Sequence, residues 1–301
     1  MFEVEATYWW FVARRQLIDE LVGGLSEPHS SRHPPPLKPP SATAEISSTD
    51  LGLSTLDFRP SIRAEKPRCR ILDAGCGTGV NLQMLAKHGD AIGVDVSPEA
   101  LKFSTKRSVG TLLNGRIERL GFHAESFGLI TALDVLEHVE DDRAAIRELH
   151  RITEPGGRLV ITVPAYQSLW SEHDEALHHY RRYTRRQLRE KLTDAGFEIE
   201  KMSYFMTLFF LPIFVFRLGQ RLLKKRQGQA QVSYIILPKW LNQLLVKILN
   251  IERWLLRWIR LPFGVSLLCV ARKPLTQEVE VVSFGAWERI GLPMRQIRWN
   301  H

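Results

Sequence analysis

One short stretch of the chain joins an apolar segment directly to alternating glycines. Residues 69–74 are Cys-Arg-Ile-Leu-Asp-Ala, and glycines follow at positions 75, 77 and 79. Glycine adopts positive φ angles at little cost, and a backbone without side chains lets a ligand approach its amide groups. Residues 80–87 then fit a helix whose N-terminus faces that ligand. The stretch therefore predicts a strand, a tight ligand-binding turn and a helix, which together open an α/β domain.

The spacing of these glycines excludes the dinucleotide fingerprint G-x-G-x-x-G. Counted from Gly75, that fingerprint needs its third glycine at position 80, which is valine. The sequence is instead D-x-G-x-G-x-G and begins at Asp73. The next apolar run ends at Asp95, twenty residues beyond Gly75, where the second strand of a βαβ unit presents a carboxylate to ribose hydroxyls. We therefore expect the loop and Asp95 to hold a nucleoside-containing cofactor.

This motif resembles that of class I S-adenosylmethionine-dependent methyltransferases, with similarity from about Arg68 to Phe205 and again near Gly264. The resemblance implies an α/β, Rossmann-like fold whose seven-stranded sheet is mostly parallel with an antiparallel last strand. It also implies S-adenosylmethionine (SAM) as the cofactor. The residues implied to bind SAM are Asp73, Gly75, Cys76, Gly77, Gly79, Asp95, Val96 and Asp134. A domain that keeps this loop but has lost catalysis stays open as an alternative.

The remaining strands of the sheet are expected in five apolar segments. The pattern and the resemblance place the third to seventh strands at 115–122, 126–133, 158–163, 197–205 and 264–272. A helix starting at Pro98 and another over residues 185–194, capped by Thr184, fit between them.

The fourth expected strand runs into Asp134-Val-Leu-Glu-His138, which matches the post-strand motif of the family. The resemblance places Asp134 near the cofactor and Glu137 and His138 at the start of the next helix. Some class I O-methyltransferases bind a divalent ion through E-x-x-E-H, of which this segment is a D-x-x-E-H variant. Because the same string is common in members without a metal, and no other oxygen-ligand cluster is evident, we predict no metal site.

Reactive side chains crowd the segment after the fifth strand, residues 164–183. They are His173, Asp174, His178, His179, Tyr180 and Tyr183. Methyl transfer from a sulfonium is an in-line displacement, so the enzyme aligns the acceptor with the methyl group and removes a proton when the acceptor is a hydroxyl. Histidine suits that role. We predict His178 as the base and His173 as the second candidate, while a structural or solvated role for each stays open.

The chain divides into four parts by composition. Residues 1–25 fit an aromatic helix, with Tyr8-Trp-Trp-Phe11, that resembles lid segments of the family. Residues 26–66 are rich in Pro and Ser and fit a disordered linker. The methyltransferase domain is expected at 67–273, with a helical insert at about 206–262, and a tail without a motif at 274–301.

Charge and cysteine content limit the partners and the compartment. The chain has 301 residues, a formal net charge of +8 and three cysteines. An odd number of cysteines in strands and the loop fits a reducing compartment, and the acidic first residues do not fit a secretory signal. Residues 181–226 hold twelve Lys and Arg against four Asp and Glu. Such an excess favours an anionic partner, although a solvated helix face explains it equally well.

The insert combines two segments suited to a membrane surface. Residues 202–216 carry no charge, and residues 240–259 alternate apolar and basic positions with helical spacing. They fit an interfacial anchor, or else a helical hairpin packed on the sheet or in a dimer. We therefore predict a cytoplasmic SAM-dependent methyltransferase that methylates an oxygen of a small or lipid-linked acceptor, with carbon or nitrogen as the alternative acceptor atom. If the insert is an interfacial anchor, the protein is expected in peripheral contact with the inner face of a membrane. An RNA methyltransferase using the basic face 181–189 is the alternative, but no RNA-binding module accompanies it, so we do not expect a nucleic-acid partner.

Overall fold

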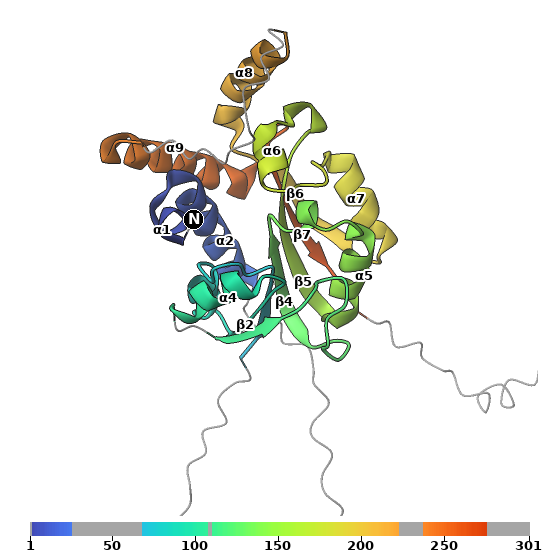
Figure 1. Cartoon of the computed structure of the whole chain (residues 1–301). Coiled ribbons are helices and arrows are strands. Elements are labelled where there is room, and N and C mark those ends of the chain that lie inside the picture. Colours follow the sequence, from blue (N-terminus) through green and yellow to red (C-terminus); the bar gives the residue numbers. More distant parts are fainter. Residues whose placement is uncertain (1, 26–67, 108–109, 223–236, 276–301) are drawn as a thin grey trace, which may run out of the picture.

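The structure is a computed structural model, and it describes residues 2–25, 68–107, 110–222 and 237–275 (Figure 1). The predicted linker 26–66 and nearly all of the predicted tail 274–301 lie outside these residues.

A single seven-stranded sheet forms the centre of the described part, in the order β3-β2-β1-β4-β5-β7-β6. The strands are β1 (Arg70–Ala74), β2 (Asp90–Asp95), β3 (Thr111–Asn114), β4 (Phe127–Leu133), β5 (Thr153–Pro164), β6 (Glu198–Phe205) and β7 (Ser266–Arg272). β7 pairs antiparallel with both β5 and β6, and the remaining pairs are parallel. This arrangement confirms the expected Rossmann-like methyltransferase fold.

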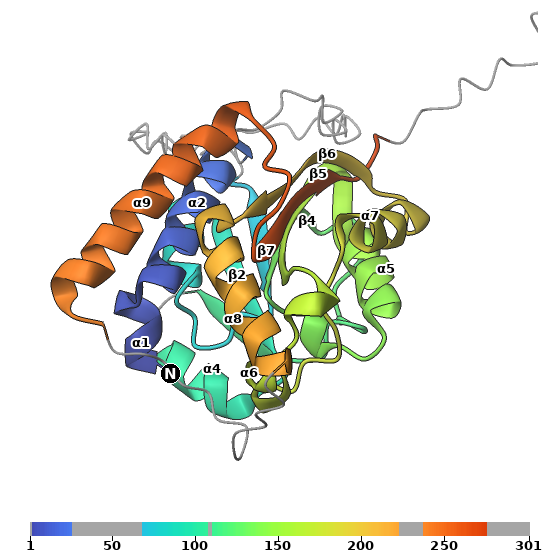
Figure 2. The ribbon, with the colours of Figure 1, turned by 90° about the horizontal axis from the view of Figure 1, so that it is seen from above.

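Helices cover both faces of the sheet (Figures 1 and 2). They are α1 (Phe2–Thr7), α2 (Trp9–Leu25), α3 (Leu82–Leu85), α4 (Pro98–Thr105), α5 (Asp142–Ile152), α6 (Glu172–Ala176), α7 (Arg185–Asp194), α8 (Phe210–Leu222) and α9 (Lys239–Trp258). Figure 2 shows α5 and α7 on one face and α2 and α9 on the other. Three short 3₁₀ turns, η1 (Leu136–His138), η2 (Gln167–Leu169) and η3 (Thr207–Phe209), lie between them.

Each buried strand contributes side chains to two apolar cores because successive residues point to opposite faces. In β1, Leu72 packs in the core on the α5 and α7 side, whereas Ile71 packs in the core on the α2 and α9 side. Leu267 and Leu268 of β7 divide in the same way. Continuous apolar runs are thus the signature of strands that are covered on both faces.

The third strand lies earlier than the sequence predicts. β3 is Thr111–Asn114, and it pairs Thr111 with Ile92 and Asn114 with Asp95, whereas the expected segment 115–122 is not a strand. The apolar residues that suggested a strand there, Ile117 and Leu120, are buried in the core from a loop. β3 itself is a short, largely exposed edge strand, so its own apolar signal is weak.

Two further local predictions need correction. The helix expected over 80–87 is a single turn, α3. Glu137 and His138 belong to η1 and do not start the next helix, because α5 begins at Asp142 after the Asp141 cap. In contrast, the helix at 185–194 is confirmed, and its Thr184 cap forms a capping box with Gln187.

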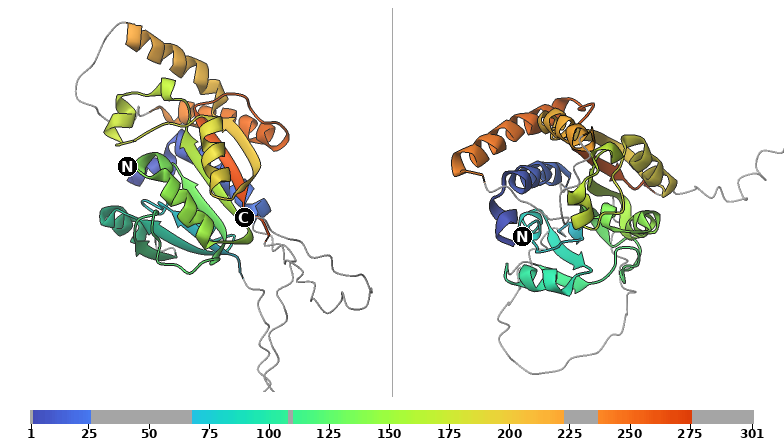
Figure 3. Two further views of the ribbon diagram at one scale, coloured as in Figure 1. Left: turned by 90° about the vertical axis from the view of Figure 1, so that its right-hand side faces the viewer. Right: turned by 45° about the horizontal axis from the view of Figure 1, so that its top comes forward.

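The insert forms two helices on the α2 side of the molecule. α9 lies beside α2 (Figure 2), where Asn242 accepts a hydrogen bond from the Trp9 amide at 2.9 Å, and Arg257 pairs with Glu20. α8 extends away from the body of the domain (Figure 3). No helix among the described residues combines the length and hydropathy needed to cross a membrane.

Candidate functional site

The three glycines of the loop after β1 all have positive φ angles, but they face different surroundings. The φ angles are 78° at Gly75, 54° at Gly77 and 77° at Gly79. A Cβ atom at Gly75 would overlap the Val135 side chain, and one at Gly79 would overlap Ser104. A Cβ atom at Gly77 would meet nothing within 4 Å. Gly75 and Gly79 are therefore required by packing, whereas Gly77 faces open space, so packing within the chain does not explain its glycine.

Asp73 lies below this loop as a buried carboxyl group with one free oxygen. The side chain is 1% exposed, its Oδ1 accepts a hydrogen bond from the Thr131 hydroxyl at 2.8 Å, and its Oδ2 has no partner among the described residues. Burial raises the pKa of Asp73 to about 6, and the bond from Thr131 offsets part of that rise. An unsatisfied buried acceptor beside a glycine loop fits a ligand that carries a hydrogen-bond donor or a positive charge, as SAM does.

Asp95 is held at the end of β2 by the loop itself. Its Oδ2 accepts a hydrogen bond from the Gly77 amide at 2.8 Å, and its Oδ1 accepts one from the Ser97 amide at 2.9 Å. Val96 follows with a side chain that is 62% exposed, so it offers apolar surface next to the carboxylate. A carboxylate and an exposed apolar side chain therefore stand side by side, as expected for a nucleoside site.

The other two predicted cofactor residues contribute differently. Cys76 is buried in the core, and burial raises the pKa of its thiol well above the usual range, so only its backbone is available to a ligand. Asp134 has a φ of 55° at the end of β4 and is fully engaged, since Oδ1 accepts from the Thr162 hydroxyl at 2.8 Å and Oδ2 pairs with Arg14.

The N-terminal helices lie against the cofactor loop. Arg14 of α2 is 7% exposed and reaches Asp134, while Glu5 of α1 accepts a hydrogen bond from the Thr78 hydroxyl. Trp9 packs on Phe209 with ring centroids 4.7 Å apart. The N-terminal helices thus contact the loop after β1, the end of β4 and η3, and their role as a lid stays a prediction from resemblance.

The two predicted catalytic histidines lie on the segment between β5 and α7. His178 has a φ of 56° and an exposed side chain on the loop between α6 and α7. His173 lies in α6, and burial lowers its pKa. Neither makes a hydrogen bond or ion pair with the cofactor-binding residues.

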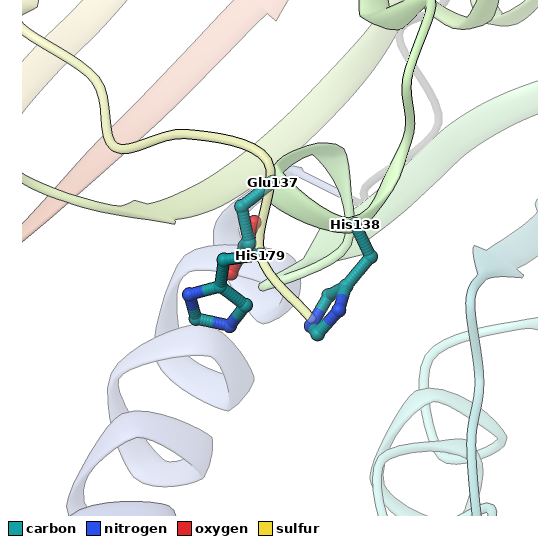
Figure 4. Close-up of side chains that lie close together, drawn as sticks. All are labelled: Glu137, His138 and His179. Atoms are coloured by element: carbon teal, nitrogen blue, oxygen red, sulfur yellow. The ribbon is translucent and has the colours of Figure 1, made fainter. Parts of the chain in front are cut away.

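A third histidine of this segment, His179, instead meets the motif after β4. The ring centroids of His138 and His179 are 4.6 Å apart, and one ligand atom each from Glu137, His138 and His179 lies within 4.8 Å of the others (Figure 4). No local pattern predicts that these three residues meet, because 41 positions separate His138 from His179.

The basic face at 181–189 is largely used within the chain. Arg181 pairs with Asp142 at 3.1 Å and Arg182 with Asp174 at 2.7 Å, while Arg185 donates to the Met202 carbonyl at 3.0 Å. These arginines tie the segment before α7 and the start of α7 to α5, α6 and β6, so three of the five arginines at 181–189 are not solvated cations that could follow a nucleic-acid backbone.

Comparison with known proteins agrees with this geometry. A family model described as a methyltransferase domain matches residues 72–161. The ubiquinone biosynthesis O-methyltransferase of Xanthomonas axonopodis pv. citri is 30% identical over 163 residues, which cover 48% of this chain and 68% of that protein. This chain belongs to the S-adenosylmethionine-dependent methyltransferases. A mitochondrial protein of Schizosaccharomyces pombe with the same description is 35% identical over 119 residues, but the match spans only 43% of its length and 36% of this methyltransferase.

Among solved structures, the [4+2]-cyclase SpnF matches the methyltransferase with a TM-score of 0.45 and 23% identity, over 69% of this chain and 75% of that one. The fold assignment therefore rests on the order and direction of the strands.

Proposed function

We propose that this methyltransferase moves the methyl group of SAM to an oxygen atom of a small or lipid-linked acceptor. The observation that carries the proposal is the Asp95 carboxylate held on the Gly77 amide at 2.8 Å, with open space on the ligand side of Gly77. The unpartnered Oδ2 of Asp73 adds a buried negative group for the cationic part of SAM. The relatives described as O-methyltransferases support oxygen as the acceptor atom.

For methyl transfer the protein mainly has to align the acceptor with the methyl group and remove a proton. SAM supplies an electrophilic methyl group, which an acceptor oxygen attacks in line as the carbon–sulfur bond breaks. The hydroxyl proton must leave to a base, for which His178 and His173 remain our candidates. His178 is open to solvent on the loop that follows β5, and the lowered pKa of His173 keeps its imidazole neutral and able to accept a proton.

Labelling of cell fractions tests the proposal directly. The purified protein is incubated with methyl-labelled SAM and with the aqueous and lipid fractions of a cell extract, and the labelled product is analysed for its acceptor atom. We expect label in a small-molecule or lipid product that is lost with Asp95→Ala. Label on nitrogen, carbon or RNA would contradict the oxygen assignment, and no labelled product in any fraction would favour a cofactor-binding scaffold.

We also propose that α8 and α9 rest on an anionic membrane surface. The exposed apolar residues of these helices are Leu211, Phe214, Val215, Phe216, Leu218, Trp240, Leu244, Ile251, Trp254 and Trp258. Trp258 is 76% exposed and Leu211 is 64% exposed, and both would be costly to leave in water. Lys239, Lys247 and Arg260 are exposed near them and complement anionic headgroups. A lipid-linked acceptor could reach the enzyme from such a surface.

A further inference from the structure

We propose that Glu137, His138 and His179 bind one divalent transition-metal ion beside the cofactor site. Their ligand atoms lie within 4.8 Å of one another, a spacing that one central ion can bridge (Figure 4). Two imidazoles and one carboxylate form a ligand set that suits zinc, iron, cobalt or nickel. The three residues come from two loops, η1 after β4 and the segment between α6 and α7.

One carboxylate oxygen of the buried Glu137 side chain lacks a hydrogen-bond partner among the described residues. The side chain is 1% exposed, and this oxygen is Oε2. Burying a carboxylate without compensation costs several kcal/mol, as a general order of magnitude. A cation at this point would supply the missing compensation.

Both imidazoles carry the outer hydrogen bonds that metal-binding histidines typically have. His179 Nδ1 lies 2.9 Å from Asp174 Oδ1, which leaves Nε2 of that ring for a metal. A ring nitrogen of His138 is hydrogen-bonded to the backbone of Leu177. Outer partners of this kind fix the tautomer and the direction of the ring.

The loop between α6 and α7 is shaped to bring His179 to Glu137. The left-handed turn at His178, with a φ of 56°, reverses the chain direction just before His179, and the Tyr180 amide donates to the Glu137 carbonyl at 2.7 Å. Asp174, which orients His179, is fully buried and is also held by Arg182 at 2.7 Å. A left-handed non-glycine residue stores strain that the surrounding contacts must hold in place.

The surrounding charges permit a cation. Arg14 and Arg182 act electrostatically on Glu137, but each is paired with a carboxylate, Asp134 and Asp174 respectively. η1 follows β4, which runs parallel to β1, so Glu137 and His138 lie at the same end of the sheet as the glycine loop. His138 is exposed, so an ion can enter from solvent.

Three protein ligands leave further coordination positions for water or for an acceptor oxygen. A hydroxyl bound there would lose its proton more readily, since a divalent ion stabilises the resulting oxyanion. This role rests on the proposed methyl transfer, whereas the binding of the ion does not.

The test measures metal binding and SAM binding separately. The full chain is treated with a chelator, dialysed and titrated with Co²⁺ or Zn²⁺, with stoichiometry from elemental analysis, affinity from calorimetry and the ligand field from the visible spectrum of Co²⁺. We expect one ion per chain. His179→Gln and Glu137→Gln should each weaken binding by at least tenfold, and His123→Gln, on the exposed loop before β4, should not.

Circular dichroism shows whether each variant folds, and the stoichiometry of the unaltered chain decides the matter if a variant does not. Fewer than one bound ion per chain, or Co²⁺ spectra and affinities that are the same in His179→Gln and Glu137→Gln as in the unaltered chain, would overturn the metal site. SAM affinity measured on the same samples tests the proposed function independently, since the glycine loop and Asp95 are untouched by these substitutions.

Discussion

Gly75 and Gly77 stand two positions apart in one loop, yet they are glycines for different reasons. Gly75 is packed against Val135, and Gly77 faces open space. We expect Gly75→Ala to destabilise the fold, because overpacking costs typically about 1–3 kcal/mol and the positive φ adds about 1–2 kcal/mol. Gly77→Ala should lower the stability of the fold only through its positive φ angle. Its added methyl group should project toward the ligand and weaken SAM binding.

Urea unfolding and calorimetry on the two variants separate these effects. Equal losses of stability, or unchanged SAM affinity in Gly77→Ala, would contradict the placement of the cofactor on the open side of Gly77.

Asp73 makes stability depend on pH in a definite direction. Its pKa is raised from 3.8 to about 6 by burial, so between these pH values the folded chain holds a proton that the unfolded chain releases. The contribution of Asp73 to the free energy of unfolding is therefore most favourable below about pH 4. This contribution, at most about 3 kcal/mol, is lost as the pH rises through 6. We expect Asp73→Asn, measured by urea unfolding at pH 4.5 and 7, to remove this part of the pH dependence. A difference between wild type and variant that does not change with pH would refute the raised pKa.

His178 and His173 allow a direct test of proton removal. If either is the base, its replacement by Ala should lower turnover by roughly 10²- to 10⁴-fold while SAM affinity stays the same. His123→Ala, on an exposed loop before β4, is the matched control. Losses below tenfold in both variants would mean that another group removes the proton, or that the hydroxyl loses it to water.

At the scale of elements, side-chain contacts tie α1 to the loop after β1 and α2 to the end of β4. The contacts are Arg14 with Asp134 and Glu5 with Thr78. If these helices act as a lid, Arg14→Met should increase both the amide exchange of residues 9–25 and the rate of SAM dissociation, because a buried ion pair is broken and Asp134 is left without its cation. Hydrogen exchange and stopped-flow fluorescence measure these rates.

Arg143→Met removes a surface pair with Asp194 at 2.6 Å and serves as the control for Arg14→Met. A dissociation rate that is the same in both variants would show that α2 is a fixed wall of the site.

At the scale of the whole molecule, α8 and α9 concentrate exposed apolar and aromatic residues on one side of the domain. We expect the protein to float with phosphatidylglycerol vesicles, with binding that weakens as salt rises, because each basic residue near such a surface contributes about 1 kcal/mol. Trp254→Ser combined with Trp258→Ser should abolish flotation, whereas Leu113→Ser, at the β3 edge, should not.

A dimer is the competing use of the same surface. Salt-independent dimers in sedimentation, together with no vesicle binding, would show that a second copy of the chain covers α8 and α9.

Local features of the chain were enough to predict most of the fold and the cofactor, and the residues expected to bind that cofactor stay a prediction. Alternating glycines, an acidic residue at the end of an apolar run, and capping residues such as Ser97 and Thr184 act within a few positions. The local structure that these features favour hardly depends on distant parts of the chain. The strand order of a βαβ fold then follows from its handedness and connections. For this reason β1, β2, β4 and α7 lie close to their expected positions.

Tertiary packing decided everything that joins residues distant in sequence. The position of β3 depends on pairing with β2, since the apolar signal of residues 115–122 came from loop residues that fill the core. Arg14 meets Asp134 across 120 positions, and His179 meets Glu137 across 42, through contacts that no local pattern encodes. The sequence by itself therefore determined the cofactor and the fold class. Only the folded chain decided that His179 lies beside Glu137. That contact depends on how η1, after β4, and the segment between α6 and α7 are held together.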